Sequence, residues 1–138
     1  MVKIIAIPPQ EVPAVFPKIK ELIFRSLEYA HGNLTINDVY AQLMETRTVL
    51  FIITNEQYSI EAFIIADVQQ YPQRKVIRIL LSAGKNLKEW KNELLEVMTS
   101  WCKKIGASRI EIIGRKGWER ALADIGFEFS HVVLTKEI

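Results

Sequence analysis

The stretch between residues 48 and 113 constrains the fold most, because strand-like and helix-like patterns follow one another there in a fixed order. Three apolar segments with strand character are separated only by short turns, at Thr48–Thr54, Ser59–Val68 and Lys75–Ser82. Turns of this length join antiparallel strands. The first segment lacks polar alternation, which indicates burial on both faces. A helix with one apolar face then runs to about Ile105, and Arg109–Ile113 reads as a further strand, so this passage is long enough for a parallel crossover.

The segments on either side extend the pattern to the whole chain. A short strand and two helices precede it, at Val2–Ile7, at Glu11 to about Ala30 and after the cap residue Thr35. A short helix from Lys116 to about Ile125 and a last strand at Phe127–Lys136 follow it. The predicted order is β-α-α-β-β-β-α-β-α-β. We expect a single α/β domain over residues 1–138, with a mixed central sheet and helices on both of its faces.

Composition excludes several classes of protein. The chain of 138 residues is 49% hydrophobic and 25% charged, which is ordinary for a folded domain and argues against disorder. Its longest apolar runs, Val49–Ile53 and Ala62–Ala66, are five residues each, whereas a membrane span needs about 20. Ile4–Ile7 is too short for the core of an export signal. With Cys102 as the lone cysteine and only two histidines, we expect neither an internal disulfide nor a metal site.

Charge is unevenly distributed along the chain. Between Arg74 and Arg120 there are 12 Lys or Arg residues against 5 Asp or Glu residues, while the rest of the chain is acidic. An excess of positive charge of this kind indicates an anionic partner, such as a phosphorylated cofactor or a nucleic acid. The alternative is that these residues form the solvated faces of helices and strands.

Several short motifs occur in a set order along the chain. They are Ala30-x-Gly32, Tyr71-Pro72, Trp90, Trp101, Gly114-Arg115-x-Gly117-Trp118 and Ile125-Gly126-Phe127. Together with the order of strands and helices, they resemble the GNAT superfamily of N-acetyltransferases over nearly the whole chain. Within that superfamily, the set is most similar to GNAT-like proteins encoded in phage and prophage genomes.

The resemblance implies a site for acetyl-CoA or another acyl-CoA. In the superfamily, acyl-CoA lies where two neighbouring parallel strands splay apart. The backbone of the earlier strand pairs with the pantetheine arm, and the amides of the following loop and helix N-terminus hold the pyrophosphate. The positions of this chain that would bind the cofactor are Leu80, Leu81, Ser82, Ala83, Gly84, Lys85, Asn86 and Lys88.

Three departures from the superfamily pattern bear on activity. The loop motif Arg/Gln-x-x-Gly-x-Gly/Ala falls on residues 81–86, where only Gly84 agrees. We expect the side chain of Asn86 to cap the helix that follows, so that it occupies amides that a pyrophosphate needs and weakens binding. The tyrosine that serves many members as general acid is replaced by Leu122, and the strand Lys75–Ser82 contains no Asp, Glu or His to act as general base.

Three residues near the carboxyl end of the predicted strand at 109–113 are further candidates. Glu111 is either a catalytic base or the ion-pair partner of Arg109 or Arg115. Arg115 follows the strand at the edge where open α/β sheets bind ligands, and its alternatives are anion binding or helix-start electrostatics. Trp118 either stacks on a ligand ring or packs in the core.

Two function classes follow from these observations. The first is an acyl-CoA-dependent N-acyltransferase-like protein with a degenerate cofactor loop. It either still transfers an acyl group from acyl-CoA to an amine acceptor or only binds the cofactor. The second is a non-catalytic phage- or prophage-derived structural or host-interaction protein, with a protein partner or a second copy of itself. Neither class requires a membrane, a nucleic acid or a metal. The expected location is the cytoplasm of a bacterial host, or the virion for a phage structural protein.

Overall fold

Five strands form one mixed sheet in the computed structural model, which describes residues 2–114 and 117–138. The strands are β1 (Lys3–Ile7), β2 (Val49–Thr54), β3 (Ile60–Gln70), β4 (Lys75–Gly84) and β5 (Arg109–Ile112). They lie side by side in chain order. The first three neighbouring pairs are antiparallel, and β4 and β5 are parallel. The predicted mixed sheet and its parallel crossover are therefore confirmed.

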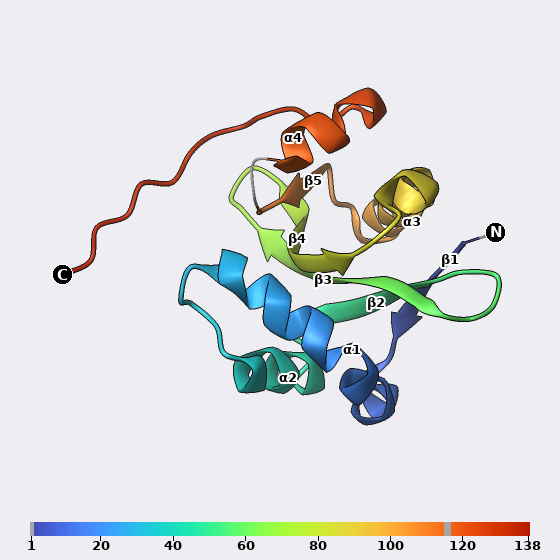
Figure 1. Ribbon diagram of the computed structural model, residues 1–138. Helices are drawn as coiled ribbons and strands as arrows, with labels where there is room; N and C mark the ends of the chain where they lie inside the picture. The colour runs from blue at the N-terminus through green and yellow to red at the C-terminus, as the bar shows by residue number, and fades with distance from the viewer. Residues whose placement is uncertain (1, 115–116) are drawn as a thin grey trace.

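Helices cover both faces of this sheet, as the sequence predicts. The α-helices are α1 (Val12–Ser26), α2 (Ile36–Met44), α3 (Leu87–Ile105) and α4 (Gly117–Ala121), and short 3-10 helices are η1 (Pro9–Glu11), η2 (Leu27–Ala30) and η3 (Ala123–Ile125). Figure 1 shows α1 and α2 on one side of the sheet and α3 and α4 on the other. No helix of the described residues is long and apolar enough to cross a membrane.

Local signals in the sequence set two of the helix ends. Thr35 begins α2 with a complete capping box: its Oγ1 accepts from the Asp38 N–H at 3.2 Å, and its own N–H donates to the Asp38 carboxylate at 2.8 Å. Gly106 ends α3 with a φ of 75°, a left-handed conformation that glycine adopts without a steric penalty. Both ends lie where the sequence pattern places them.

Two apolar layers hold the helices to the sheet. Ile19 and Ile23 of α1 pack with Phe63 in the layer under α1 and α2. Trp90 and Met98 of α3 belong to the other layer. Successive residues of β2 point alternately into these layers, so the strand is buried on both faces, as its uninterrupted apolar sequence predicts.

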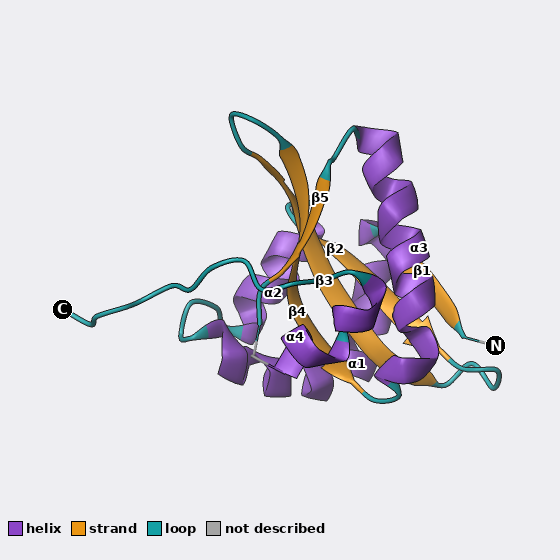
Figure 2. Cartoon of the chain, turned by 90° about the horizontal axis from the view of Figure 1, so that it is seen from above, coloured by secondary structure: helices purple, strands orange, loops and turns teal. Residues whose placement is uncertain are grey.

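The predicted last strand, Phe127–Lys136, is wrong. Residues 127–138 carry no regular secondary structure in the described chain, and they run away from the body after η3 (Figures 1 and 2). The run Val132-Val133-Leu134 has strand propensity, but a strand also needs a paired neighbour, and propensity does not provide one. Because no described strand covers the outer edge of β5, Arg109 is exposed and the other residues of that strand are only half-buried.

Candidate functional site

An extra residue in β4 opens the sheet between β4 and β5. Ile65 of β3 lies opposite Leu81 and Ala66 lies opposite Ile79, so Leu80 is a bulge that bends β4. The pairing of β4 with β5 ends at Ile79, whose carbonyl accepts from the backbone N–H of residue 113 at 3.0 Å. Beyond this point no described strand pairs with the β5-side edge of β4, and its backbone groups are open to a ligand.

A cavity of about 560 Å³ lies at this opening. Its walls come from the end of β4 and the loop after it, from the residues following β5, from α4, from α1 and η2, and from the start of β3. The lining residues are Leu22, Arg25, Ser26, Glu28, Tyr29, Ile60, Glu61, Leu80, Leu81, Ser82, Ala83, Gly84, Lys85, Ile113, Gly114 and Trp118.

The cavity brings most of the predicted cofactor-binding residues together. Residues 80–85 and Trp118 line it, whereas Asn86 and Lys88 lie just beyond, at the start of α3. Glu111 is not among the described lining residues, and Arg115 lies outside the described residues. The wall from α1 and η2 was not predicted, because only the packing of α1 over β4 brings it there.

Gly84 is required by the close approach of β4 to β3. Its φ is +143°, and a Cβ atom at this position would lie 2.5 Å from the Cα of Ala62 and against the carbonyl oxygen of Glu61. These atoms belong to the backbone of β3, so a side chain at residue 84 would push the two strands apart. The one glycine that matches the superfamily loop therefore has a packing role in this chain.

The prediction that the Asn86 side chain caps α3 is wrong. Asn86 adopts φ 62° and ψ 35°, and no described side chain caps this end of the helix. Its Nδ2 group donates instead to Oε2 of Glu61 at 2.9 Å. A buried carboxylate is a stronger acceptor than a solvated one and needs donors, so it draws the amide away from the helix end. The N–H groups of the first turn of α3 are consequently not occupied by a side-chain cap.

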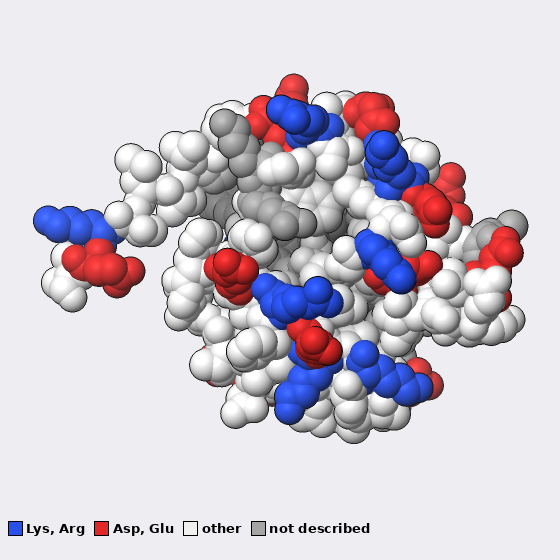
Figure 3. Space-filling model, viewed as in Figure 1, with Lys and Arg blue, Asp and Glu red and all other residues white. Residues whose placement is uncertain are grey.

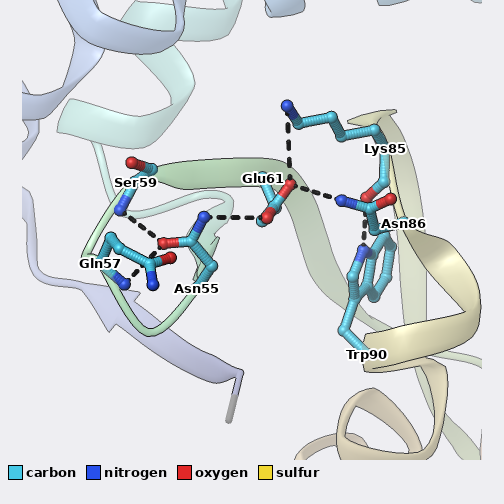
Figure 4. A network of polar contacts seen from close by, with 7 residues as sticks. All are labelled: Asn55, Gln57, Ser59, Glu61, Lys85, Asn86 and Trp90. Atoms are coloured by element: carbon cyan, nitrogen blue, oxygen red, sulfur yellow. Dashed lines mark hydrogen bonds and ion pairs between the residues drawn. The ribbon is translucent and has the colours of Figure 1, made fainter.

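Glu61 is the centre of a polar network at the end of the cavity (Figure 4). Glu61 is 7% exposed, the Asn55 side-chain amide donates to its Oε1 at 3.0 Å, and the Lys85 ammonium lies 4.0 Å from its Oε2. The backbone N–H of Lys85 also donates to the Glu61 carbonyl at 3.0 Å. Sequence reasoning missed Glu61, although a carboxylate directly before the apolar run Ala62–Ala66 is a visible signal.

Glu111 lies in a second group of charges, outside the described lining of the cavity. Its Oε2 is 3.7 Å from Nη1 of Arg109, and it stands opposite Arg78 in the β4–β5 register. Arg78 is held by Asp67 through two hydrogen bonds, of 2.9 and 2.7 Å, and the hydrogen bond to Asp67 raises the pKa of the guanidinium. Glu111 therefore has an arginine partner, the structural alternative stated above.

Trp118 packs directly over the end of β5 while it lines the cavity. A Cβ atom on Gly114 would lie 2.9 Å from Cδ1 and Nε1 of the indole, so glycine at 114 leaves room for the ring. Leu122, at the position of the superfamily tyrosine, is 1% exposed and offers no proton donor.

Some of the basic residues between Arg74 and Arg120 form ion pairs or hydrogen bonds within the protein. Lys91 of α3 binds both carboxylate oxygens of Asp124 at 2.8 Å, and this contact lowers the pKa of that carboxyl. Lys75 donates to the Ile105 carbonyl at 2.9 Å. On the face shown in Figure 3, the basic and acidic side chains of the described residues are interspersed. The described residues contain no cluster of His, Cys, Asp or Glu suited to a metal ion.

Comparison with protein-family models and with curated proteins found no match. Solved structures, in contrast, match over the whole chain. An aminoglycoside acetyltransferase from an uncultured soil metagenomic sample has a TM-score of 0.73 at 14% identity, covering 100% of this chain and 99% of that chain. Glucosamine-6-phosphate N-acetyltransferase from Arabidopsis thaliana has a TM-score of 0.67 at 15% identity, covering 99% and 98%. A predicted acetyltransferase from Clostridium acetobutylicum, solved with acetyl-CoA, has a TM-score of 0.68 at 12% identity, covering 99% and 96%.

The alignment with the aminoglycoside acetyltransferase covers 100% of this chain and therefore includes the parallel β4–α3–β5 crossover. The chain is a single α/β domain with the fold of the GNAT acetyltransferases.

Proposed function

We propose that this protein binds acyl-CoA in the cavity where β4 separates from β5. The observation that carries the proposal is the bulge at Leu80, which leaves the end of β4 unpaired beside a cavity of about 560 Å³. Cavities of roughly 300–1,000 Å³ are typical of small-molecule sites. The α3 helix begins at one end of this cavity without a side-chain cap among the described residues, which suits a phosphate group.

The chain offers a distinct group for each part of such a ligand. The open edge of Leu80–Gly84 provides backbone donors and acceptors for the amides of the pantetheine arm. The first turn of α3, with the exposed ammonium groups of Lys85 and Lys88 beside it, provides positive potential for the phosphates. Acyl-CoA, when bound, supplies an acyl group activated as a thioester.

Acyl transfer to an amine also needs a general base and a general acid, and few residues of the site are suited to these roles. Leu122 has no ionisable group, and each carboxylate oxygen of Glu61 accepts from an asparagine. Glu111 lies outside the described lining of the cavity, beside Arg109. Glu28 on η2 is the remaining carboxylate of the described lining, and it is exposed to solvent. We therefore propose binding of acyl-CoA with slow transfer to an amine at most.

A non-catalytic role is the second candidate, and the extended tail favours it. Phe129, Val132, Val133 and Leu134 are 60–90% exposed, an unusual concentration of apolar surface on a soluble chain. Such a segment suits a protein partner. This candidate includes the structural or host-interaction role in a phage or prophage setting.

Two double variants of α3 and its preceding loop test the binding proposal. Lys85→Gln with Lys88→Gln removes two charges at the proposed phosphate end, and Lys103→Gln with Lys104→Gln removes two charges at the other end of the same helix. Exposed pairs contribute about 0.2–1 kcal/mol each, so the first variant should weaken acetyl-CoA binding by roughly 2- to 25-fold and the control should not.

Thermal unfolding with added acetyl-CoA provides the readout. Ligand at 100 times its dissociation constant stabilises the folded state by about 2.7 kcal/mol. A melting temperature that does not respond to millimolar acetyl-CoA removes the binding proposal and leaves the non-catalytic candidate. An equal effect of the two double variants shows that the ligand binds elsewhere.

A further inference from the structure

A second bulge, in β3, places the Glu61 carboxylate at the start of α3. Thr54 of β2 lies opposite Ile60 and Ile53 lies opposite Ala62, so Glu61 is the extra residue between them. A bulge redirects the side chain of the inserted residue out of the regular alternation of the strand. Here it brings a carboxylate to the junction of β4 and α3, 25 residues further along the chain.

Asn86 has two competing hydrogen-bonding arrangements. In sequence, Asn86 with Glu89 three residues later is typical of a side chain that caps its own helix. In the structure, the Glu89 N–H donates to the Asn86 backbone carbonyl at 2.8 Å, while the Asn86 side chain binds Glu61. A capping residue normally has an extended backbone, whereas Asn86 is left-handed at φ 62°. The two arrangements exclude each other, and Glu61 stabilises the one in which the helix end has no side-chain cap.

Further contacts hold the loop in this arrangement. The indole Nε1 of Trp90, which is 3% exposed, donates to the Lys85 carbonyl at 2.8 Å. The Lys85 N–H donates to the backbone of Glu61 itself. The loop is thus fixed to β3 on one side and to α3 on the other, and the Glu61 carboxylate controls the residue between them (Figure 4).

We propose that Glu61 is a positioning residue of the acyl-CoA site, which keeps the Asn86 side chain off the first turn of α3 and so leaves that end of the cavity open to the ligand. The inference rests on the proposed function. In this proposal Glu61 acts by holding Asn86 in position, and each of its oxygens accepts from an asparagine amide. This role explains how Asn86 can stand at a position where the superfamily has a small residue. Asparagine tolerates the left-handed backbone better than most other residues that have a side chain. Glu61 then binds the Asn86 side chain, which a glycine would not have.

The first experiment uses the protein without ligand. Glu61→Met keeps an unbranched side chain of similar length and removes both acceptors. Backbone chemical shifts and the three-bond HN–Hα coupling of residue 86 report whether it is left-handed or extended. We expect a left-handed Asn86 in the wild type and an extended Asn86 in Glu61→Met. Glu61→Gln should retain the wild-type conformation, because its oxygen can accept from the Asn55 amide, which Gln57 and Ser59 hold in place, and its amide group can donate to Oδ1 of Asn86 once the Asn86 amide is flipped. A left-handed Asn86 in folded Glu61→Met overturns the inference.

The second experiment measures acetyl-CoA affinity by calorimetry in two backgrounds. Glu61→Met also removes a negative charge 4.0 Å from the Lys85 ammonium, and this acts on affinity equally in both backgrounds. In the Asn86→Gly background there is no side chain to cap the helix, and Gly adopts the left-handed backbone unaided, so Glu61→Met changes affinity there only through this charge. In the wild-type background the cap adds a further weakening of about fivefold, the factor that corresponds to one side-chain cap. An equal change of affinity in both backgrounds overturns the inference.

The two experiments separate this inference from the proposed function. If neither the wild type nor Asn86→Gly binds acetyl-CoA, the proposed function fails. The conformation of residue 86 in the ligand-free protein then still decides whether Glu61 controls Asn86.

Discussion

Replacement of Gly84 by alanine tests how β4 approaches β3. The new Cβ would lie 2.5 Å from the Cα of Ala62 and against the Ala62 Cβ and the Glu61 carbonyl oxygen, and none of these atoms can rotate away. The positive φ of +143° at residue 84 also strains the backbone of any residue that has a side chain. Strain of this kind costs about 1–3 kcal/mol and overpacking costs about 1–3 kcal/mol more. We therefore expect Gly84→Ala to lower the free energy of unfolding by about 2–6 kcal/mol.

Gly106→Ala is the matched control for this variant. Gly106 also has a positive φ, +75°, but a Cβ atom there would have no neighbour within 4 Å. It should therefore cost only the left-handed penalty of about 1–2 kcal/mol. Both variants are compared with the wild type by urea unfolding monitored by circular dichroism. If Gly84→Ala is no less stable than Gly106→Ala, the close contact between β4 and β3 is not real and the reasoning is refuted.

Three further predictions concern titratable groups. Glu111→Gln should leave acetyl-CoA affinity unchanged in calorimetry, because Glu111 lies outside the described lining of the cavity; a loss of tenfold or more would place it in the site. Burial raises the pKa of the Cys102 thiol, so a thiol reagent should label it slowly in the native protein and rapidly in urea; equal rates would contradict its burial. The backbone N–H and side chain of Thr35 hold the pKa of Asp38 below its ordinary value of 3.8, so the stability from this carboxylate is present above that pH and is lost as the pH falls through the lower, folded value. The melting temperature of the wild type should fall more steeply below pH 4 than that of Asp38→Asn, and parallel curves would contradict this.

The order of strands and helices could be predicted because local signals determine it. Short turns require antiparallel neighbours, and the segment between β4 and β5 is long enough for a parallel crossover. The capping box at Thr35 and the left-handed Gly106 are likewise local. The segment from Leu80 to Lys85 could be placed at the site because the resemblance to the GNAT superfamily implies a cofactor site there, and these residues line the cavity.

Features that depend on distant residues could not be predicted. A single inserted residue, Glu61 in β3 or Leu80 in β4, leaves the apolar pattern of its strand almost unchanged, yet it decides where the strand bends. The conformation of Asn86 depends on Glu61, and nothing in the sequence near Asn86 indicates this partner. The tail after Gly126 has strand propensity but no strand beside it, and propensity cannot reveal that absence.

The central claim is that acyl-CoA binds in the cavity where β4 separates from β5, with its phosphates at the start of α3. Its most direct test is a titration of isotope-labelled protein with acetyl-CoA, followed by amide chemical shifts. The account predicts that the largest shifts occur at residues 80–88, at Ile113 and at the Trp118 indole, while Lys103 and Lys104 at the far end of α3 stay unchanged. An absence of shifts at millimolar acetyl-CoA, or shifts confined to other parts of the chain, would contradict it.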